Sequence, residues 1–292
     1  MQPAELIKNV RRIQIKSRRI ADAMAGGRYR SAFRGSGAEF EEVREYAPGD
    51  EVKSIDWKVT ARMGRPYVKV YREERELSVM LAVDVSASGL FGSRGARKRN
   101  LAVEMGAVLA VSALRNGDKA GLLLFSDRVE RFIPPKRGSG HVWRCIREML
   151  ECEPAGRGTD IAAAAEFLGR VGRKRGVVFV ISDFLDDGYL PALKRLGRRN
   201  DVIAAALSDP GDFSLPSAGI LETRDLESGR TMLFDCSDKR TRVAYEKARR
   251  AERAETLSGF AASGIDCLEL SGQGAAADAL RAFFRKRERR RR

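Results

Sequence analysis

The chain has 292 residues, of which 43% are hydrophobic, and it carries a formal net charge of +15 at pH 7. This apolar content excludes a disordered chain, and the length is enough for one large core or two modest ones. No segment is long and apolar enough to cross a membrane, and the N-terminus lacks the apolar centre of a secretory signal. We therefore expect a folded protein of the cytoplasm.

The positive charge is concentrated at the two ends of the sequence. Residues 1–30 hold eight Lys and Arg against two Asp and Glu, and residues 281–292 hold eight against one. A groove for nucleic acid normally combines basic residues with aromatic ones for base stacking, and neither end has that mixture. We expect no specific nucleic-acid partner. Weak contact of the basic ends with an anionic membrane, or binding of nucleic acid through them, stays open as an alternative function.

The residues for several other kinds of site are missing from the sequence. The four cysteines show no CxxC spacing and the chain has one histidine, His141, which argues against a structural zinc site. No nucleophile elbow accompanies the histidine, and no GxxxxGK[ST] phosphate loop is present. A zinc protein, a serine hydrolase and a nucleotide-binding protein are therefore disfavoured.

The first 76 residues form a lead-in of mixed character. Residues 4–25 space their apolar side chains as in an amphipathic helix, whereas residues 26–76 are charged, rich in turns and contain strand-like stretches. The acidic and basic side chains of residues 39–58 predict an ion-pair network that fixes the segment against the following sheet. A docking surface is the alternative for the same charges.

From Leu77 the sequence alternates between apolar runs of strand length and helical segments, which predicts helices on both faces of a mostly parallel sheet. The expected fold class is α/β with three αβα layers over residues 77–272, followed by a basic helical tail at 273–292. A β-hairpin insertion is expected at 219–235. The expected strands are residues 77–86, 119–126, 176–184, 201–208 and 265–270, and the expected helices are residues 99–116, 140–152, 160–171, 189–199, 239–262 and 275–288.

Oxygen-bearing side chains occur in three fragments at the edge where such sheets bind ligands. Two of the fragments end predicted strands, and the third precedes a predicted helix. The fragment DVSAS offers Asp84, Ser86 and Ser88, the fragment GRGTD offers Thr159, and the fragment ISDF offers Asp183. Two carboxylates and three hydroxyls suit Mg²⁺, or a related ion such as Mn²⁺ or Ca²⁺, because such ions prefer oxygen ligands. The sequence therefore predicts a divalent-metal site at these loop tips.

The fragment DVSAS, with the downstream threonine and aspartate, resembles the metal-ion-dependent adhesion site of von Willebrand A domains. The resemblance implies that Ser86, Ser88 and Thr159 bind the ion directly, and that Asp84 and Asp183 bind it directly or through water. Neutral hydroxyls leave the ion with much of its charge, so that a carboxylate from a partner protein completes the shell. The implied function is protein binding without catalysis.

The lead-in run GSGAEFEEVREYAPGDEVKSIDWKVTARMGRPYVKVYREER, followed by the DVSAS strand, resembles the bacterial domain-of-unknown-function 58 family over about residues 25–210. This resemblance implies a partner or adaptor of a MoxR-type AAA+ ATPase in protein maturation or complex assembly. One departure is Gly89, where many relatives have methionine. Because that side chain is not a ligand, the expected metal site is unaffected.

The best enzyme alternative is a magnesium-dependent phosphatase of the haloacid-dehalogenase type, with Asp84 as nucleophile. Asp183, Asp186 and Asp187 resemble the later acidic motif of those enzymes. Such an enzyme needs a second acid two residues after the nucleophile, and this chain has Ser86 there. We therefore expect no catalytic residue.

Overall fold

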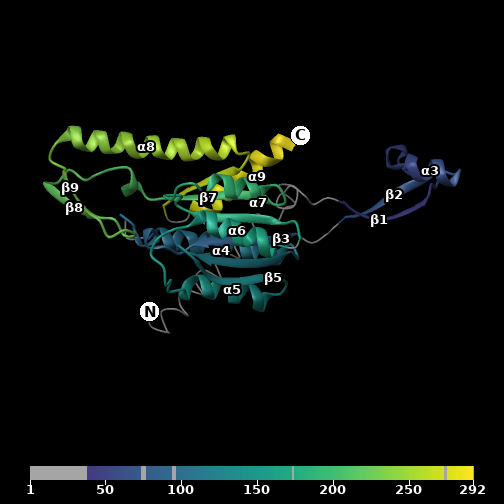
Figure 1. Ribbon diagram of the computed structural model, residues 1–292, viewed down its shortest axis with the longest axis horizontal. Coiled ribbons are helices and arrows are strands. Elements are labelled where there is room, and N and C mark those ends of the chain that lie inside the picture. Colours follow the sequence, from purple (N-terminus) through teal and green to yellow (C-terminus); the bar gives the residue numbers. More distant parts are fainter. Residues whose placement is uncertain (1–37, 74–76, 94–96, 173, 273–274, 292) are drawn as a thin grey trace.

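The computed structural model describes residues 38–73, 77–93, 97–172, 174–272 and 275–291 (Figure 1). At its centre lies a six-stranded sheet in the order β10-β7-β6-β3-β4-β5. All neighbouring strands in it are parallel except β4 and β5, which pair antiparallel. The strands are β3 (Ser78–Asp84), β4 (Lys119–Phe125), β5 (Val129–Lys136), β6 (Val177–Ser182), β7 (Asp201–Ser208) and β10 (Asp266–Ser271).

Helices cover both faces of this sheet. One core contains side chains of α4 (Lys98–Arg115), α5 (Ser139–Glu151) and α9 (Ala275–Arg291). The core on the opposite face contains side chains of α6 (Ile161–Val171), α7 (Leu190–Gly197) and, through Phe260, α8 (Lys239–Ala262). The predicted three-layer αβα architecture is therefore confirmed. No helix in the described ranges combines the length and the apolar character needed to cross a membrane.

The side chains of strand β3 enter the cores on both faces of the sheet, which explains its almost continuously apolar sequence. Val79, Leu81 and Val83 enter the core with α4, whereas Met80 and Ala82 enter the core with α6. Successive side chains of a strand point to opposite faces, and here both faces are covered. Apolar residues are therefore needed at each of positions 79–83.

The edge strand β5 was not predicted from the sequence. Its sequence VERFIPPK lacks the continuous apolar run of the central strands and contains two prolines, and only Ile133 is buried among its side chains. Proline lacks the amide hydrogen that a central strand needs, so it is tolerated at the edge of a sheet. Because β5 pairs antiparallel with β4, a short loop is enough to connect the two strands at the edge of the sheet.

The basic C-terminal segment predicted at 273–292 contains the helix α9, and this helix packs on the α/β domain. Ala276, Leu280, Phe283 and Phe284 are buried in the core beside α4, at the spacing of one helix face. Arg287 is also buried, with its guanidinium between Asp201 and Asp266. The last helix is thus part of the α/β domain, and its positive charge obscured its apolar face.

The described part of the lead-in is a two-stranded antiparallel ribbon, β1 (Ala38–Glu45) and β2 (Tyr67–Glu73), that stands apart from the sheet in Figure 1. Between its strands lie the short helices η1 (Val52–Ser54) and α3 (Trp57–Met63). Its ion pairs, such as Arg44–Asp50 at 2.7 Å, join two residues of the lead-in. These pairs therefore do not fix the ribbon to the sheet as expected. The helix predicted at 4–25 lies outside the described residues.

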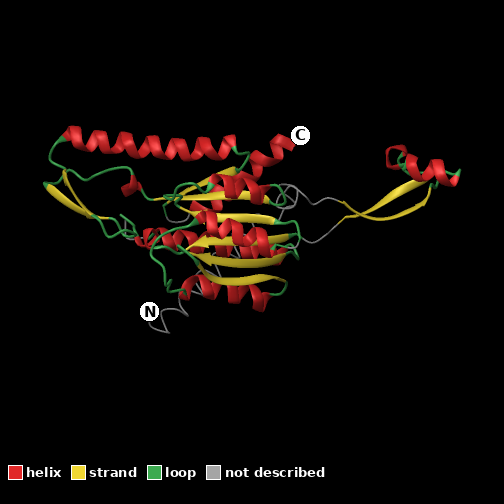
Figure 2. Ribbon diagram, in the orientation of Figure 1, coloured by secondary structure: helices red, strands yellow, loops and turns green. Residues whose placement is uncertain are grey.

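A second small hairpin follows β7 and η3 (Pro210–Asp212). Its strands β8 (Ile220–Arg224) and β9 (Thr231–Asp235) pair antiparallel, and α8 begins soon afterwards. Figure 2 shows the hairpin beyond one end of the central sheet, away from the lead-in ribbon. Its turn contacts the loops that carry the candidate site.

Candidate functional site

The site lies at the carboxyl ends of β3 and β6, where the strand order reverses. From β3 the chain continues to β4 on one side, and it later crosses to β6 on the other side of β3. Loops that leave two such strands diverge and leave a crevice between them. Asp84 ends β3 and Ser182 ends β6, and the Ser182 hydroxyl donates a hydrogen bond to Oδ2 of Asp84 at 2.6 Å. The two strand ends are therefore directly linked.

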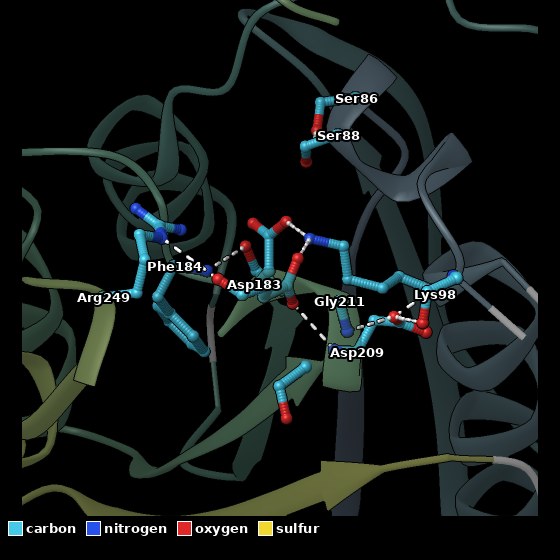
Figure 3. Close-up of polar contacts among 12 residues, drawn as sticks. Ser86, Ser88, Lys98, Asp183, Phe184, Asp209, Gly211 and Arg249 are labelled. Carbon is cyan, nitrogen blue, oxygen red and sulfur yellow. Dashed lines mark hydrogen bonds and ion pairs between the residues drawn. The ribbon is translucent and has the colours of Figure 1, made fainter. Parts of the chain in front are cut away.

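The DVSAS loop folds back on its own aspartate. The other carboxylate oxygen of Asp84 accepts the backbone N–H of Ser86 at 2.9 Å. The hydroxyls of Ser86 and Ser88 lie 3.0 Å apart (Figure 3), and the short helix η2 (Ala87–Leu90) begins between them. The loop thus brings three of the five predicted ligands together.

Thr159 lies on a loop that is anchored from β5. The Glu130 carboxylate accepts the backbone N–H of Gly156 at 2.9 Å, and the backbone N–H of Ala87 donates to the carbonyl of Arg157 at 2.9 Å. Asp160 caps α6 by accepting the N–H of Ala163 at 2.7 Å. Asp160 therefore forms the cap of α6, and the adjacent hydroxyl of Thr159 is left for other contacts.

Asp183 follows β6 and is buried beside a lysine. The ammonium of Lys98 lies 2.7 Å from Oδ2 of Asp183 (Figure 3), and the lysine side chain is 3% exposed. Oδ1 of Asp183 is buried and has no hydrogen-bond partner among the described residues. One oxygen of this carboxylate is thus neutralised by an ion pair, while the other lacks a donor.

The next residue, Phe184, has a left-handed φ of 58°, which is rare for a bulky side chain. Its ring packs against Phe260 and Tyr189, with centroid separations of 4.9 and 5.6 Å. Backbone strain of this kind costs about 1–3 kcal/mol and persists only where surrounding packing holds it. The aromatic cluster therefore holds the sharp turn that follows Asp183.

The buried carboxylate of Asp84 is disfavoured in its charged form. Burial raises the pKa of Asp84 to about 7, and the charge of Asp183 raises it too. Burial lowers the pKa of Lys98, but the charges of Asp183 and Asp212 outweigh it and keep the pKa above its usual value. The pair of aspartates would therefore be stabilised by more positive charge than Lys98 alone supplies.

Lys98 was missed in the sequence because it lies in a basic run before a helix, where a solvated side chain is the usual outcome. Its ammonium also contacts Asp212 at 3.3 Å. Asp212 in turn accepts the backbone N–H of Asp209 at 2.7 Å. These contacts join the β7 loop to the site, and no local sequence signal indicates them.

Glu227, at the turn of the β8–β9 hairpin, was also missed as a site residue. The hydroxyl of Thr159 donates to its Oε1 at 2.8 Å. Burial raises the pKa of Glu227, while hydrogen bonds from Thr159, Ser88 and Ser86 lower it. Of the three hydroxyls that were predicted as metal ligands, that of Thr159 therefore donates directly to this carboxylate, and those of Ser86 and Ser88 lie near enough to lower its pKa.

Direct contacts thus join Asp84, Ser86 and Ser88, whereas Asp183 follows the neighbouring strand β6 and Thr159 lies on a loop that is bonded to the DVSAS loop through its backbone. Within the described ranges, no three His, Cys, Asp or Glu side chains form a metal-binding group by themselves. A cation here would therefore need the hydroxyls as ligands. The donor set suits a hard divalent ion, and the buried Oδ1 of Asp183 supplies an oxygen that lacks a partner. A small pocket beside it is lined by Asp84, Ser88, Gly89, Lys98, Arg99, Ala102, Ser182, Asp183 and Leu207.

Asp186, which belongs to the acidic motif of the phosphatase alternative, has a structural role. Asp186 accepts the backbone N–H of Ile161 at 2.9 Å, at the start of α6. Asp187 is exposed, and its own backbone N–H donates to Asp186. Both oxygens of the supposed nucleophile, Asp84, accept hydrogen bonds. This arrangement gives the phosphatase alternative no further support.

Solved structures with a related arrangement share little sequence with this chain. A conserved hypothetical protein BatB from Bacteroides thetaiotaomicron aligns over 73% of this chain and 99% of its own, with a TM-score of 0.48 and 18% identity. The SpRpn10 VWA domain aligns over 71% of this chain and 95% of its own, with a TM-score of 0.38 and 10% identity.

Comparison of the sequence with other proteins identifies relatives at higher identity than the solved structures do. Uncharacterized protein Mb1516 of Mycobacterium bovis is 32% identical over 269 residues, which is 91% of this chain and 84% of that protein. Uncharacterized protein YeaD of Bacillus subtilis is 26% identical over 167 residues, which is 57% of this chain and 40% of that protein. A family model described as "Protein of unknown function DUF58" matches residues 42–255. This match spans most of the sequence and confirms the predicted resemblance: the chain belongs to the DUF58 family.

Proposed function

We propose that this chain is a protein-binding module that depends on a divalent metal ion, and that it has no catalytic role of its own. The observation that carries the proposal is that Asp84 and Asp183 follow the neighbouring strands β3 and β6, close to the paired hydroxyls of Ser86 and Ser88, and that Oδ1 of Asp183 is buried without a hydrogen-bond partner among the described residues. In this proposal Mg²⁺, or Mn²⁺ or Ca²⁺, is held by the hydroxyls and the two aspartates.

The ion would supply positive charge for binding an acidic side chain of another protein. Three of the five proposed ligands are neutral hydroxyls, so they leave the charge of the ion largely uncompensated. The chain's own residues orient the site: Ser182 fixes Asp84, and Phe184 fixes the turn after Asp183. A partner carboxylate is the chemical group that such a site favours.

Replacing both DVSAS serines, as Ser86→Ala/Ser88→Ala, is expected to remove the heat of Mg²⁺ binding in titration calorimetry, because two hydroxyl ligands are lost. The matched control is Ser217→Ala/Ser258→Ala, which changes two exposed serines away from the site and should bind as the wild type does. Equal heats for the wild type and the Ser86/Ser88 variant would contradict the proposal, provided that circular dichroism shows both to be folded.

A MoxR-type AAA+ ATPase is the partner that we propose from the family resemblance. When the two proteins are co-expressed, the ATPase should co-purify with the wild type in Mg²⁺, and the amount should fall sharply in EDTA or with Asp84→Ala. Asp84 joins the ends of β3 and β6, so the thermal unfolding of this variant is measured in parallel. Retention of the ATPase by a folded Asp84→Ala protein in EDTA would exclude metal-dependent binding of this partner.

A further inference from the structure

The turn of the β8–β9 hairpin places an acidic side chain at the candidate metal site. Glu227 is half-buried, and its Oε1 accepts the Thr159 hydroxyl at 2.8 Å. The hydroxyls of Ser86 and Ser88 lie near enough to lower the pKa of this carboxylate. A side chain from far along the sequence therefore contacts one of the hydroxyls that are proposed to hold the ion and lies near the other two.

The backbone of the turn sets the position of Glu227. The Asp225 carboxylate accepts the backbone N–H groups of Glu227 and Ser228 at 2.9 and 2.7 Å. Gly229 has a φ of 72°, a conformation that favours glycine, and its N–H donates to the carbonyl of Asp225 at 2.9 Å. The hydrogen bonds within the turn thus present the glutamate in one orientation.

The rest of the hairpin is held loosely. Ile220 and Leu233 are 77% and 70% exposed, so its strands bury little apolar surface. The Phe234 ring packs on Tyr245 of α8 with a centroid separation of 5.6 Å, which anchors the base of β9. An isolated two-stranded hairpin is marginally stable in water. Release of the turn from the site would therefore cost little.

We propose that Glu227 is an internal carboxylate ligand of the metal site, in the place that the acidic side chain of a partner takes. This inference rests on the proposed function. Binding of the ion and docking of the turn would strengthen each other, because coupling between two sites is reciprocal. A partner carboxylate would then have to displace residues 225–229, so that the hairpin limits access to the site.

The first test measures Mn²⁺ affinity by electron paramagnetic resonance. Glu227→Gln keeps the size of the side chain but removes the charge, and it should weaken Mn²⁺ binding by about tenfold or more. The matched control is Glu222→Gln, which makes the same change at an exposed position on β8. The control should bind Mn²⁺ as the wild type does.

The second test follows the hairpin itself by amide hydrogen exchange. Mn²⁺ should slow exchange in residues 219–236 of the wild type and of Glu222→Gln, because the docked turn is stabilised. The ion should have little effect on these amides in Glu227→Gln. Loss of this response without loss of helical circular dichroism separates an effect at the site from unfolding.

The third test uses acetate as a free carboxylate. In protein loaded with Mn²⁺, the methyl protons of acetate should relax faster with Glu227→Gln than with the wild type, because the internal competitor has been removed. Equal Mn²⁺ affinity, equal amide exchange and equal acetate relaxation in the two proteins would overturn the role of Glu227 and leave the proposed function standing. Absence of Mn²⁺ and Mg²⁺ binding to the wild type would overturn both.

Discussion

Replacing Arg287 by methionine is expected to lower the free energy of unfolding by about 3–5 kcal/mol, since it removes one member of a buried ion pair. Its guanidinium donates two hydrogen bonds to Asp201, at 2.6 and 2.8 Å, and a third to Asp266 at 2.7 Å. The arginine side chain is 8% exposed, and that of Asp201 is 4% exposed. Without the arginine, the buried carboxylate of Asp201 would lose the two hydrogen bonds and the positive charge that the guanidinium supplies.

The free energy of unfolding of Arg287→Met is measured by urea denaturation, which is followed by circular dichroism. Arg281→Met is the control on the same helix, because Arg281 is about half exposed and pairs with an exposed Asp278; it should change stability by less than about 0.5 kcal/mol. The double variant Arg287→Met/Asp201→Asn should recover part of the loss, because it also removes the buried negative charge of Asp201. A loss below about 1 kcal/mol for Arg287→Met would mean that α9 does not depend on this pair.

Lys98→Met is expected to cost a similar amount, about 3–5 kcal/mol, when divalent ions are removed by a chelator. The lysine ammonium lies 2.7 Å from Asp183 and 3.3 Å from Asp212. The charge of Asp183 also raises the pKa of Asp84, which is buried beside it. Removing the ammonium leaves these buried carboxylates without their nearest positive charge.

The same variant tests the metal proposal through stability. If a divalent ion binds beside Asp183, Mg²⁺ should raise the melting temperature of Lys98→Met more than that of the wild type, because a ligand that binds the folded state stabilises it. Lys194→Met, at an exposed position on α7, should behave like the wild type in both buffers. A variant that loses stability but gains nothing from Mg²⁺ would argue that Lys98 alone balances the aspartates.

Lys98 and Glu227, which the sequence did not indicate as site residues, both contact residues that are far away along the chain. Lys98 reaches Asp183 across 85 positions of the sequence, and Thr159 reaches Glu227 across 68. A lysine in a basic run and a glutamate in a polar turn are ordinary surface residues by every local measure. Their partners depend on how helices and loops pack, and no periodicity in the sequence records that.

The sequence by itself determined the α/β fold and the five candidate ligands, because both follow from short-range rules. A strand buried on both faces must be apolar at nearly every position, as in β3 and β6, and side chains that follow such strands gather at one edge of a parallel sheet. Only the tertiary structure decided that α9 belongs to the core, that β5 closes one edge, and that Lys98 and Glu227 flank the aspartates and hydroxyls. Those outcomes depend on charge neutralisation and packing between distant segments, which are properties of the folded chain.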